Sequence, residues 1–241
     1  MSPERFARIN EMLDNRQPDL TVILDQVHKT NNIAAVLRSA DAVGVHQLHA
    51  VWPENDMRVS GNTASGSQQW VKTKRHPTVT DAIAALKAEG MQVVVTNFSS
   101  KAKDFREIDY TRPTAIVLGH EKFGVSDEAL ALADAEVIIP MVGMVQSLNV
   151  SVAGALVLFE AERQRRHAGM YGSRKLPEDY CQQLLFEQGH PIYAKACRRK
   201  GLAYPAIDES GQIQASDEWW QKMREADPES PRPERGRQRR M

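Results

Sequence analysis

Short apolar runs that alternate with stretches of helical periodicity constrain the fold of this chain more than any other feature. The runs are rich in Val, Ile and Leu, which suits strands that are buried on both faces. They cover Leu20–Leu24, Gln47–Trp52, Met91–Thr96, Pro113–Gly119 and Ala135–Ile139, with a weaker run at Trp70–Lys74. Amphipathic segments such as Asn31–Gly44 and Val79–Glu89 lie between them. This alternation predicts an α/β domain with a mostly parallel sheet and helices on both faces.

The two ends of the chain have a different pattern. Residues 3–16 place Phe6, Ile9 and Leu13 on one helical face. After residue 166 the sequence predicts helices over Pro177–Gln188, Tyr193–Arg199 and Ser216–Ala226, without further strands. We therefore expect an N-terminal helical extension (1–18), an α/β domain (19–166), a C-terminal helical extension (167–227) and a disordered Arg-rich tail (228–241). A polar loop is expected over 56–67.

Composition excludes several classes of protein. The 31 basic residues balance the 31 acidic residues, so no global field indicates a nucleic-acid partner, although basic residues are enriched between 161 and 200. The longest apolar run, Val152–Phe159, is too short to cross a bilayer, and Met1–Phe6 has no signal-peptide character. We expect a cytoplasmic protein without a membrane partner, in which Cys181 and Cys197 stay reduced.

One stretch combines a strand end, a loop and a helix start. It runs from 138 to 153, with Pro140 and Gly143 in the loop and two good helix N-cap residues, Ser147 and Asn149, after it. In parallel sheets this order of elements places ligand sites at the carboxyl edge. A buried connection without any chemistry would have the same local sequence, so the stretch alone does not decide between the two.

Polar residues near predicted strand ends provide candidates for a site. They are Asn32, Arg38, Glu121, Ser147 and Asn149, which should converge at one crevice of the sheet. The chain has no Gly-x-Gly-x-x-Gly fingerprint, P-loop or Gly-x-Ser-x-Gly elbow. His46 and His49 have no third ligand nearby, so no metal is expected. These residues suit binding and orientation, but by themselves they do not name a reaction.

Three motifs of the chain resemble the sequence motifs of a known family. They are Asn32-x-x-x-x-x-Arg38, Gly119-x-Glu121-x-x-Gly124 and Ile139-Pro140-Met141-x-Gly143-x-x-x-Ser147-Leu148-Asn149-Val150-Ser151, followed by Glu160. In this order they are similar to the motifs of the SpoU branch of the SPOUT RNA methyltransferases. The family usually has Gly two residues after the motif Asn, where this chain has Ala34. The N-terminal helix, the Phe105–Pro113 segment and the C-terminal extension resemble members that methylate the ribose of guanosine 18 in the tRNA D-loop.

The resemblance implies a deep trefoil knot in the C-terminal part of the α/β domain, a homodimer whose active site draws on both chains, and S-adenosylmethionine as methyl donor. It implies that backbone groups near Thr96, Gly119, Ile139 and Leu148 hold the adenosine. It gives Arg38 the central catalytic role, either as the group that takes the 2′-hydroxyl proton or as one that orients the hydroxyl and stabilises alkoxide charge. Asn32, Glu121, Ser147 and Asn149 would shape the site.

The resemblance also gives the basic residues a partner. Arg5, Arg8, Arg163, Arg165 and Arg166 would contact tRNA phosphates, although solvated helix faces carry similar charge. No DNA partner is implied. Two alternatives stay open: a family member that methylates ribosomal RNA, which usually has an additional N-terminal RNA-binding domain, and a noncatalytic tRNA-binding protein, which would not need Arg38 and Asn32.

Overall fold

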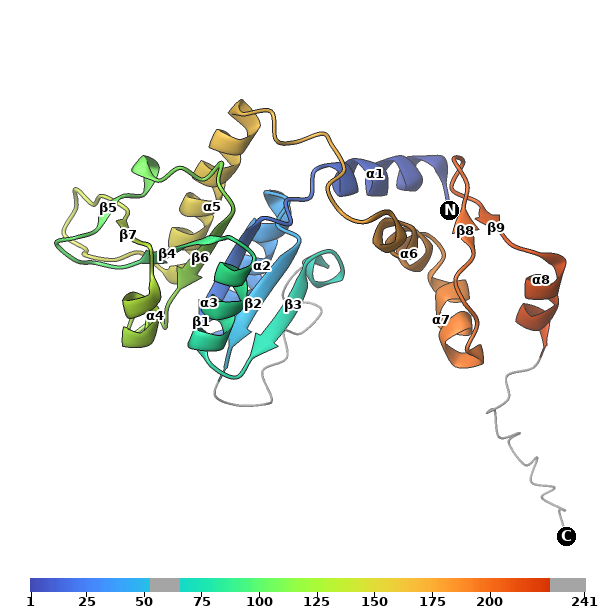
Figure 1. The fold of residues 1–241 in the computed structure, drawn as a ribbon, viewed down its shortest axis with the longest axis horizontal. Helices are drawn as coiled ribbons and strands as arrows, with labels where there is room; N and C mark the ends of the chain where they lie inside the picture. Colours follow the sequence, from blue (N-terminus) through green and yellow to red (C-terminus); the bar gives the residue numbers. More distant parts are fainter. Residues whose placement is uncertain (53–65, 226–241) are drawn as a thin grey trace, which may run out of the picture. The chain divides into compact units, whose positions relative to one another are not determined.

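The computed structural model describes residues 1–52 and 66–225 (Figure 1). The chain forms two compact units: Asp14–Lys175, and a second unit that combines Met1–Leu13 with the chain from Leu176. The larger unit thus extends beyond residue 166, where the sequence placed the end of the α/β domain. Most of the loop predicted over 56–67 and the whole tail predicted over 228–241 lie outside the described residues.

A seven-stranded sheet forms the centre of the larger unit, and all of its strand pairs are parallel. Its order is β3-β2-β1-β6-β4-β7-β5. The strands are β1 Leu20–Asp25, β2 Gln47–Val51, β3 Lys72–His76, β4 Gln92–Thr96, β5 Lys103–Asp104, β6 Thr114–Leu118 and β7 Ala135–Ile138. The apolar runs therefore predicted the inner strands, and the predicted fold class is confirmed.

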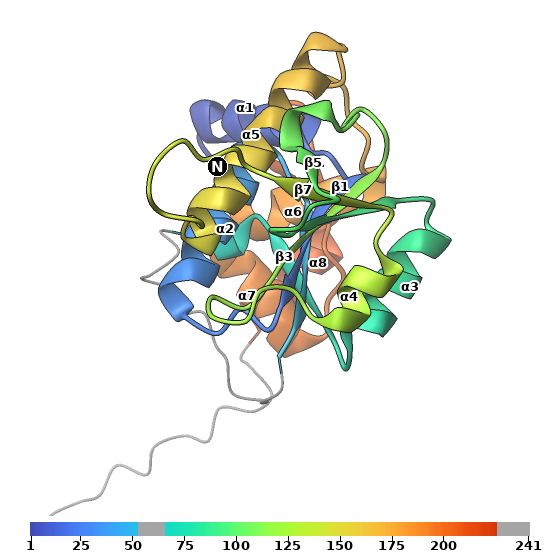
Figure 2. The ribbon, with the colours of Figure 1, turned by 90° about the vertical axis from the view of Figure 1, so that its left-hand side faces the viewer.

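Helices cover both faces of the sheet, as Figure 2 shows. α2 (Thr30–Ala42) and α5 (Val150–His167) pack together on one face, and α3 (Val79–Ala88) and α4 (Asp127–Leu132) pack together on the other. Alternate residues of β1 serve the two cores: Val22 lies in the core under α2 and α5, and Ile23 in the core under α3 and α4. This alternation explains why the strand is apolar throughout. Short 3₁₀ helices occur at Ser67–Gln69 and Phe105–Glu107.

The second unit is mainly helical. Most of α1 (Pro3–Asp14) belongs to it, with α6 Glu178–Gly189, α7 Pro191–Lys200, a small antiparallel pair β8 Ala206–Ile207 and β9 Ile213–Gln214, and α8 Asp217–Arg224. Arg5 ties α1 to the end of α6, because its Nε and Nη2 donate to the Gln188 carbonyl at 3.1 and 2.9 Å. Within the described ranges, no helix has the length and apolar character that a membrane crossing requires.

Candidate functional site

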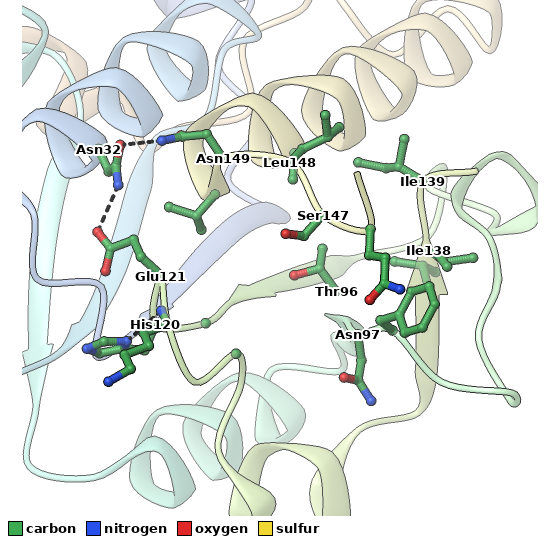
Figure 3. A pocket seen from close by; sticks show the side chains of 18 of the residues that line it. Asn32, Thr96, Asn97, His120, Glu121, Ile138, Ile139, Ser147, Leu148 and Asn149 are labelled. Atoms are coloured by element: carbon green, nitrogen blue, oxygen red, sulfur yellow. Dashed lines mark hydrogen bonds between the residues drawn. The ribbon is translucent and has the colours of Figure 1, made fainter. Parts of the chain in front are cut away.

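A cavity of about 520 Å³ lies in the larger unit at the carboxyl ends of β4, β6 and β7 (Figure 3). Thr96 and Asn97 line it from the end of β4, the segment that begins at Gly119 from the end of β6, and Ile138 and Ile139 from the end of β7. Residues 146–150, which lead into α5, complete the lining. Ligands bind in such crevices of parallel α/β sheets. The stretch from 138 to 153 is therefore part of a cavity, not a plain connection.

Gly119 has to be glycine because the chain folds back closely at this point. A Cβ atom on Gly119 would lie 2.2 Å from the backbone carbon of Gly124. The turn that causes this approach is closed by two backbone hydrogen bonds of 2.8 Å between His120 and Gly124. The absence of a side chain leaves the backbone at the end of β6 open to the cavity. This close approach explains Gly119, and a φ of +75° explains Gly124, the second glycine of the motif.

A hydrogen-bonded chain of side chains joins three elements at one end of the cavity. The Asn32 amide, on α2, donates to Oε1 of Glu121 at 2.8 Å, and the Asn149 amide donates to Oδ1 of Asn32 at 3.1 Å (Figure 3). Asn149 is also the N-cap of α5, since its Oδ1 accepts from the Ser151 backbone N–H at 2.8 Å. The structure thus brings together three of the predicted site residues, and it assigns the N-cap to Asn149 rather than Ser147.

Glu121 is held as a carboxylate. Burial tends to raise its pKa, but hydrogen bonds from Asn32 and from the backbone N–H groups of Lys29 and His28 outweigh burial and lower the pKa to about 2. His28 adds its ring Nδ1, 2.8 Å from Glu121 Oε2. At neutral pH both carboxylate oxygens therefore act only as acceptors.

The predicted donor-binding residues all line the cavity: Thr96, Gly119, Ile139 and Leu148, together with Ser147. Arg38 does not. It lies on α2, six residues after Asn32, and at about 100° per residue the two side chains point in directions about 120° apart around the helix axis. Its side chain is exposed and has no hydrogen bond or ion pair within 1–52 and 66–225. Arg38 is therefore not part of the pocket lining of its own chain.

The predicted RNA-binding arginines divide into two groups. Arg8, Arg163 and Arg166 are exposed and pair with acids of their own helix: Arg8 with Glu11, Arg163 with Glu160 and Arg166 with Glu162. Arg5 is also exposed, at the end of α6. Arg165 is fully buried. The expectation that Arg165 contacts tRNA is wrong, because a fully buried guanidinium cannot reach a phosphate.

Sequence reasoning missed two histidines beside Glu121. The rings of His28 and His120 stack with centroids 4.6 Å apart, and His120 lines the cavity. Nδ1 of His120 accepts from the Lys122 backbone N–H at 2.9 Å, which helps to fix the turn. The position of His28 in the sequence could have identified it as a candidate, because it follows the end of β1 as Glu121 follows the end of β6.

Comparisons with known proteins agree with this geometry. The model of the SpoU rRNA methylase family matches residues 19–159, and a SpoU rRNA methylase C-terminal model matches 163–216. The tRNA (guanosine(18)-2′-O)-methyltransferase of Escherichia coli (strain K12) is 58% identical over 228 residues, covering 94% of this chain and 100% of that protein.

Two solved structures extend the comparison. The crystal structure of the A. aeolicus TrmH/SpoU tRNA modifying enzyme has a TM-score of 0.71 and 40% identity, and covers 75% of this chain and 92% of that one. The SpoU methyltransferase AviRb from Streptomyces viridochromogenes, in complex with AdoMet, has a TM-score of 0.55 and 33% identity, and covers 63% and 59%. Fold and site define a parallel α/β protein with a ligand pocket at the carboxyl edge of its sheet. The chain belongs to the SpoU methylase family.

Proposed function

We propose that this protein transfers a methyl group from S-adenosylmethionine to the ribose 2′-oxygen of guanosine 18 in tRNA. The observation that carries the proposal is the pocket beside the Asn149–Asn32–Glu121 chain, in a protein 58% identical to a tRNA (guanosine(18)-2′-O)-methyltransferase over that relative's full length. We assign the reaction to the cytoplasm, as expected for a tRNA substrate.

The pocket residues fit the methyl donor. Leu148 and Ile139 provide apolar surface for an adenine ring, and Gly119 leaves backbone groups open beside it. Thr96 is fixed, since its hydroxyl donates to the Val117 carbonyl at 3.2 Å. The bound donor supplies an electrophilic methyl group on a sulfonium. We assign the adenosine to Thr96, Gly119, Ile139 and Leu148, and assign Asn32, Glu121, Ser147 and Asn149 to shaping the side of the pocket that receives the ribose.

Arg38 orients the ribose hydroxyl and stabilises the alkoxide charge that develops during transfer. It acts in a homodimer, where a second copy brings Arg38 to the pocket of the first. An exposed apolar row on α5 supports this assembly: Val152, Leu156 and Phe159 are 47%, 41% and 50% exposed at helical spacing. Val142, Met144 and Val145, in the loop before α5, add more exposed apolar surface.

Several exposed arginine side chains are available to contact the RNA backbone. We assign phosphate contacts to Arg5, Arg8, Arg163 and Arg166, each of which keeps its guanidinium at the surface. The acids that pair with three of them are on their own helices and exchange readily, since exposed ion pairs are worth about 0–1 kcal/mol.

The test is a transfer assay with radiolabelled S-adenosylmethionine and separate tRNA and ribosomal RNA pools, followed by mapping of the modified nucleotide. We expect label only in tRNA, at the ribose of guanosine 18. Arg38→Ala should abolish transfer and leave donor affinity, measured by calorimetry, unchanged. Arg106→Ala, an exposed arginine outside the pocket lining, is the matched control. Label in ribosomal RNA, or no label in either pool, would refute the proposed function.

A further inference from the structure

A buried acid lies beside the turn that forms one wall of the pocket. Leu24 of β1 pairs with Leu118 of β6, so the next residues of the two strands, Asp25 and Gly119, are neighbours. Asp25 is only 1% exposed. Acidic side chains are rarely buried to this degree unless they are paired, because burial of an acid costs free energy. No step of the proposed reaction uses Asp25, so its place in the interior requires another reason.

Asp25 makes a hydrogen bond to the segment that follows the turn. Its Oδ2 accepts from the backbone N–H of Ser126 at 2.8 Å. Its other oxygen, Oδ1, has no hydrogen-bond partner among the residues that the structure describes. An acid with one unsatisfied buried oxygen is a costly way to stabilise a core. Ser126 is also the N-cap of α4, so this hydrogen bond joins the end of β1 to the point where α4 begins.

The chain just before Ser126 is in direct contact with the pocket wall. A Cβ atom on Gly119 would lie 2.2 Å from the backbone nitrogen of Val125, so Gly124 and Val125 pack against the end of β6. Gly119 and Gly124 both line the pocket. If Ser126 moved away from Asp25, the spacing between these two glycines would change. The backbone surface that the pocket presents to a ligand would change with it.

A second acid fixes the same two segments from the opposite direction. Oε1 of Glu121, within the turn, accepts from the backbone N–H of Lys29, in the segment after β1, at 3.1 Å. Each segment therefore contributes one acid that accepts a backbone N–H of the other: Asp25 from Ser126, and Glu121 from Lys29. This reciprocal arrangement fixes the turn at both of its ends.

The backbone directly after Asp25 has a conformation that favours glycine. Gln26 has a φ of +58°, and no other non-glycine residue within 1–52 and 66–225 has a positive φ. The Gln26 N–H donates to the Val51 carbonyl at 3.0 Å, which fixes the direction in which the chain leaves β1. Such conformations persist where the surrounding structure holds them, and they are concentrated at functional sites.

We propose that Asp25 is a positioning residue for the methyl-donor pocket; this rests on the proposed methyltransferase function. Asp25 acts through the Ser126 N–H, which it holds so that Gly124 and Val125 stay packed against Gly119. Its effect is therefore on the shape of the donor site. The chemical step, once the donor is bound, depends on it much less.

The test compares two substitutions of Asp25 with a control on the same strand. Asp25→Ala removes the acceptor for Ser126, whereas Asp25→Asn keeps one oxygen that can accept this N–H. Thr21→Val is the matched control: Thr21 is 2% exposed, and its hydroxyl donates to the Gln47 carbonyl at 2.6 Å, at the other end of β1. Urea denaturation measures the stability of each variant. Calorimetry with S-adenosylmethionine, at a temperature where the variant is folded, measures donor affinity.

We expect Asp25→Ala to weaken donor affinity about tenfold, which corresponds to about 1.4 kcal/mol, and Asp25→Asn to restore most of it. In Asp25→Ala, kcat/KM for the donor should fall much more than kcat at saturating donor. Thr21→Val should lose stability and keep the wild-type donor affinity. In hydrogen-exchange NMR of the full protein, the Ser126 amide should exchange faster in Asp25→Ala and at its native rate in Thr21→Val.

Other results would overturn the assignment. Wild-type donor affinity in Asp25→Ala, or an unchanged exchange rate of the Ser126 amide, would show that the hydrogen bond does not shape the pocket. An equal loss of donor affinity in Thr21→Val would reduce the role of Asp25 to general stability. These outcomes differ from failure of the proposed function, in which the wild-type protein itself would neither bind S-adenosylmethionine nor methylate guanosine 18.

Discussion

Arg165 illustrates how one charged side chain can connect distant parts of the larger unit from its interior. Its Nε donates to the Tyr110 carbonyl at 2.8 Å, and its Nη1 donates to Asp19 Oδ1 at 2.6 Å and Gln17 Oε1 at 3.2 Å. Its Nη2 donates to the carbonyls of Asp19 and Arg112, both at 3.0 Å. A buried guanidinium is tolerated when it is paired and its hydrogen-bonding capacity is met, as here.

Arg165 and Arg163 should therefore respond oppositely to substitution. Arg165→Met leaves Asp19 and the carbonyls without their donor, and should lower the free energy of unfolding by about 3 kcal/mol. Arg163, 67% exposed, should change stability by less than about 0.5 kcal/mol when replaced by Ala. Arg163→Ala should instead weaken tRNA binding and reduce the salt slope by about 0.9. Urea denaturation and filter binding measure the two effects. Arg165→Met with native stability and weakened binding would contradict this division.

The sequence could separate these arginines only through periodicity. Arg165 follows Ala161 by four residues and Leu158 by seven, so it continues the buried stripe of α5, whereas Arg163 and Arg166 do not. Composition, which groups the three together, does not carry that information. The strand-end rule did predict Asn32, Glu121 and Asn149 as neighbours, because parallel strands bring their carboxyl ends to one edge. The same rule would have applied to His28, which follows the end of β1, but the prediction did not include it.

At the scale of elements, we expect the β2–β3 pair at the edge of the sheet to be sensitive to acid. His49 on β2 is buried, and its Nδ1 lies 2.8 Å from Nε2 of His76 on β3. Burial, with the neighbouring His76 and Lys74, lowers the pKa of His49 to about 4. Burial, with Lys72 and Arg16, lowers the pKa of His46 to about 4 as well. Both rings are neutral in the folded protein at pH values where the unfolded chain would protonate them.

The free energy of unfolding should therefore be largest above about pH 6.5 and fall as the pH drops toward 4, since the unfolded state then binds more protons than the native state. Urea denaturation at a series of pH values measures this slope. His49→Leu should flatten it, because one of the histidines with a lowered pKa is gone. A slope that is unchanged in this variant would show that other groups cause the acid sensitivity.

Elements were predictable where they carry a periodic apolar pattern. The inner strands and the long helices follow their predicted ranges within a few residues. β3 begins two residues after the predicted run, because its residues are largely exposed and leave no apolar signal. β5, β8 and β9 were missed because each is two residues long, too short for any period.

At the scale of the whole molecule, the separation of Arg38 from the pocket gives a direct test of the proposed dimer. Arg38→Ala and Asn32→Ala should each be inactive alone. If Arg38 acts across the interface, a mixed dimer contains one intact site, with Asn32 from one chain and Arg38 from the other. Unfolding and refolding an equal mixture should then restore about one quarter of the wild-type activity. Activity that stays absent while mass spectrometry shows mixed dimers would place Arg38 in the pocket of its own chain.

The strand order of the sheet has a consequence for when the pocket comes into being. β4, β6 and β7 adjoin in the sheet, yet β6 lies between β1 and β4, so distant segments have to pair before the three strand ends meet. Non-local parallel pairing is slow compared with helix formation. A nascent or partly refolded chain would thus acquire helices first and the cavity last. The methyl donor then binds the finished fold and none of its precursors, so it acts as a reporter of complete folding and, by mass action, as a stabiliser of it.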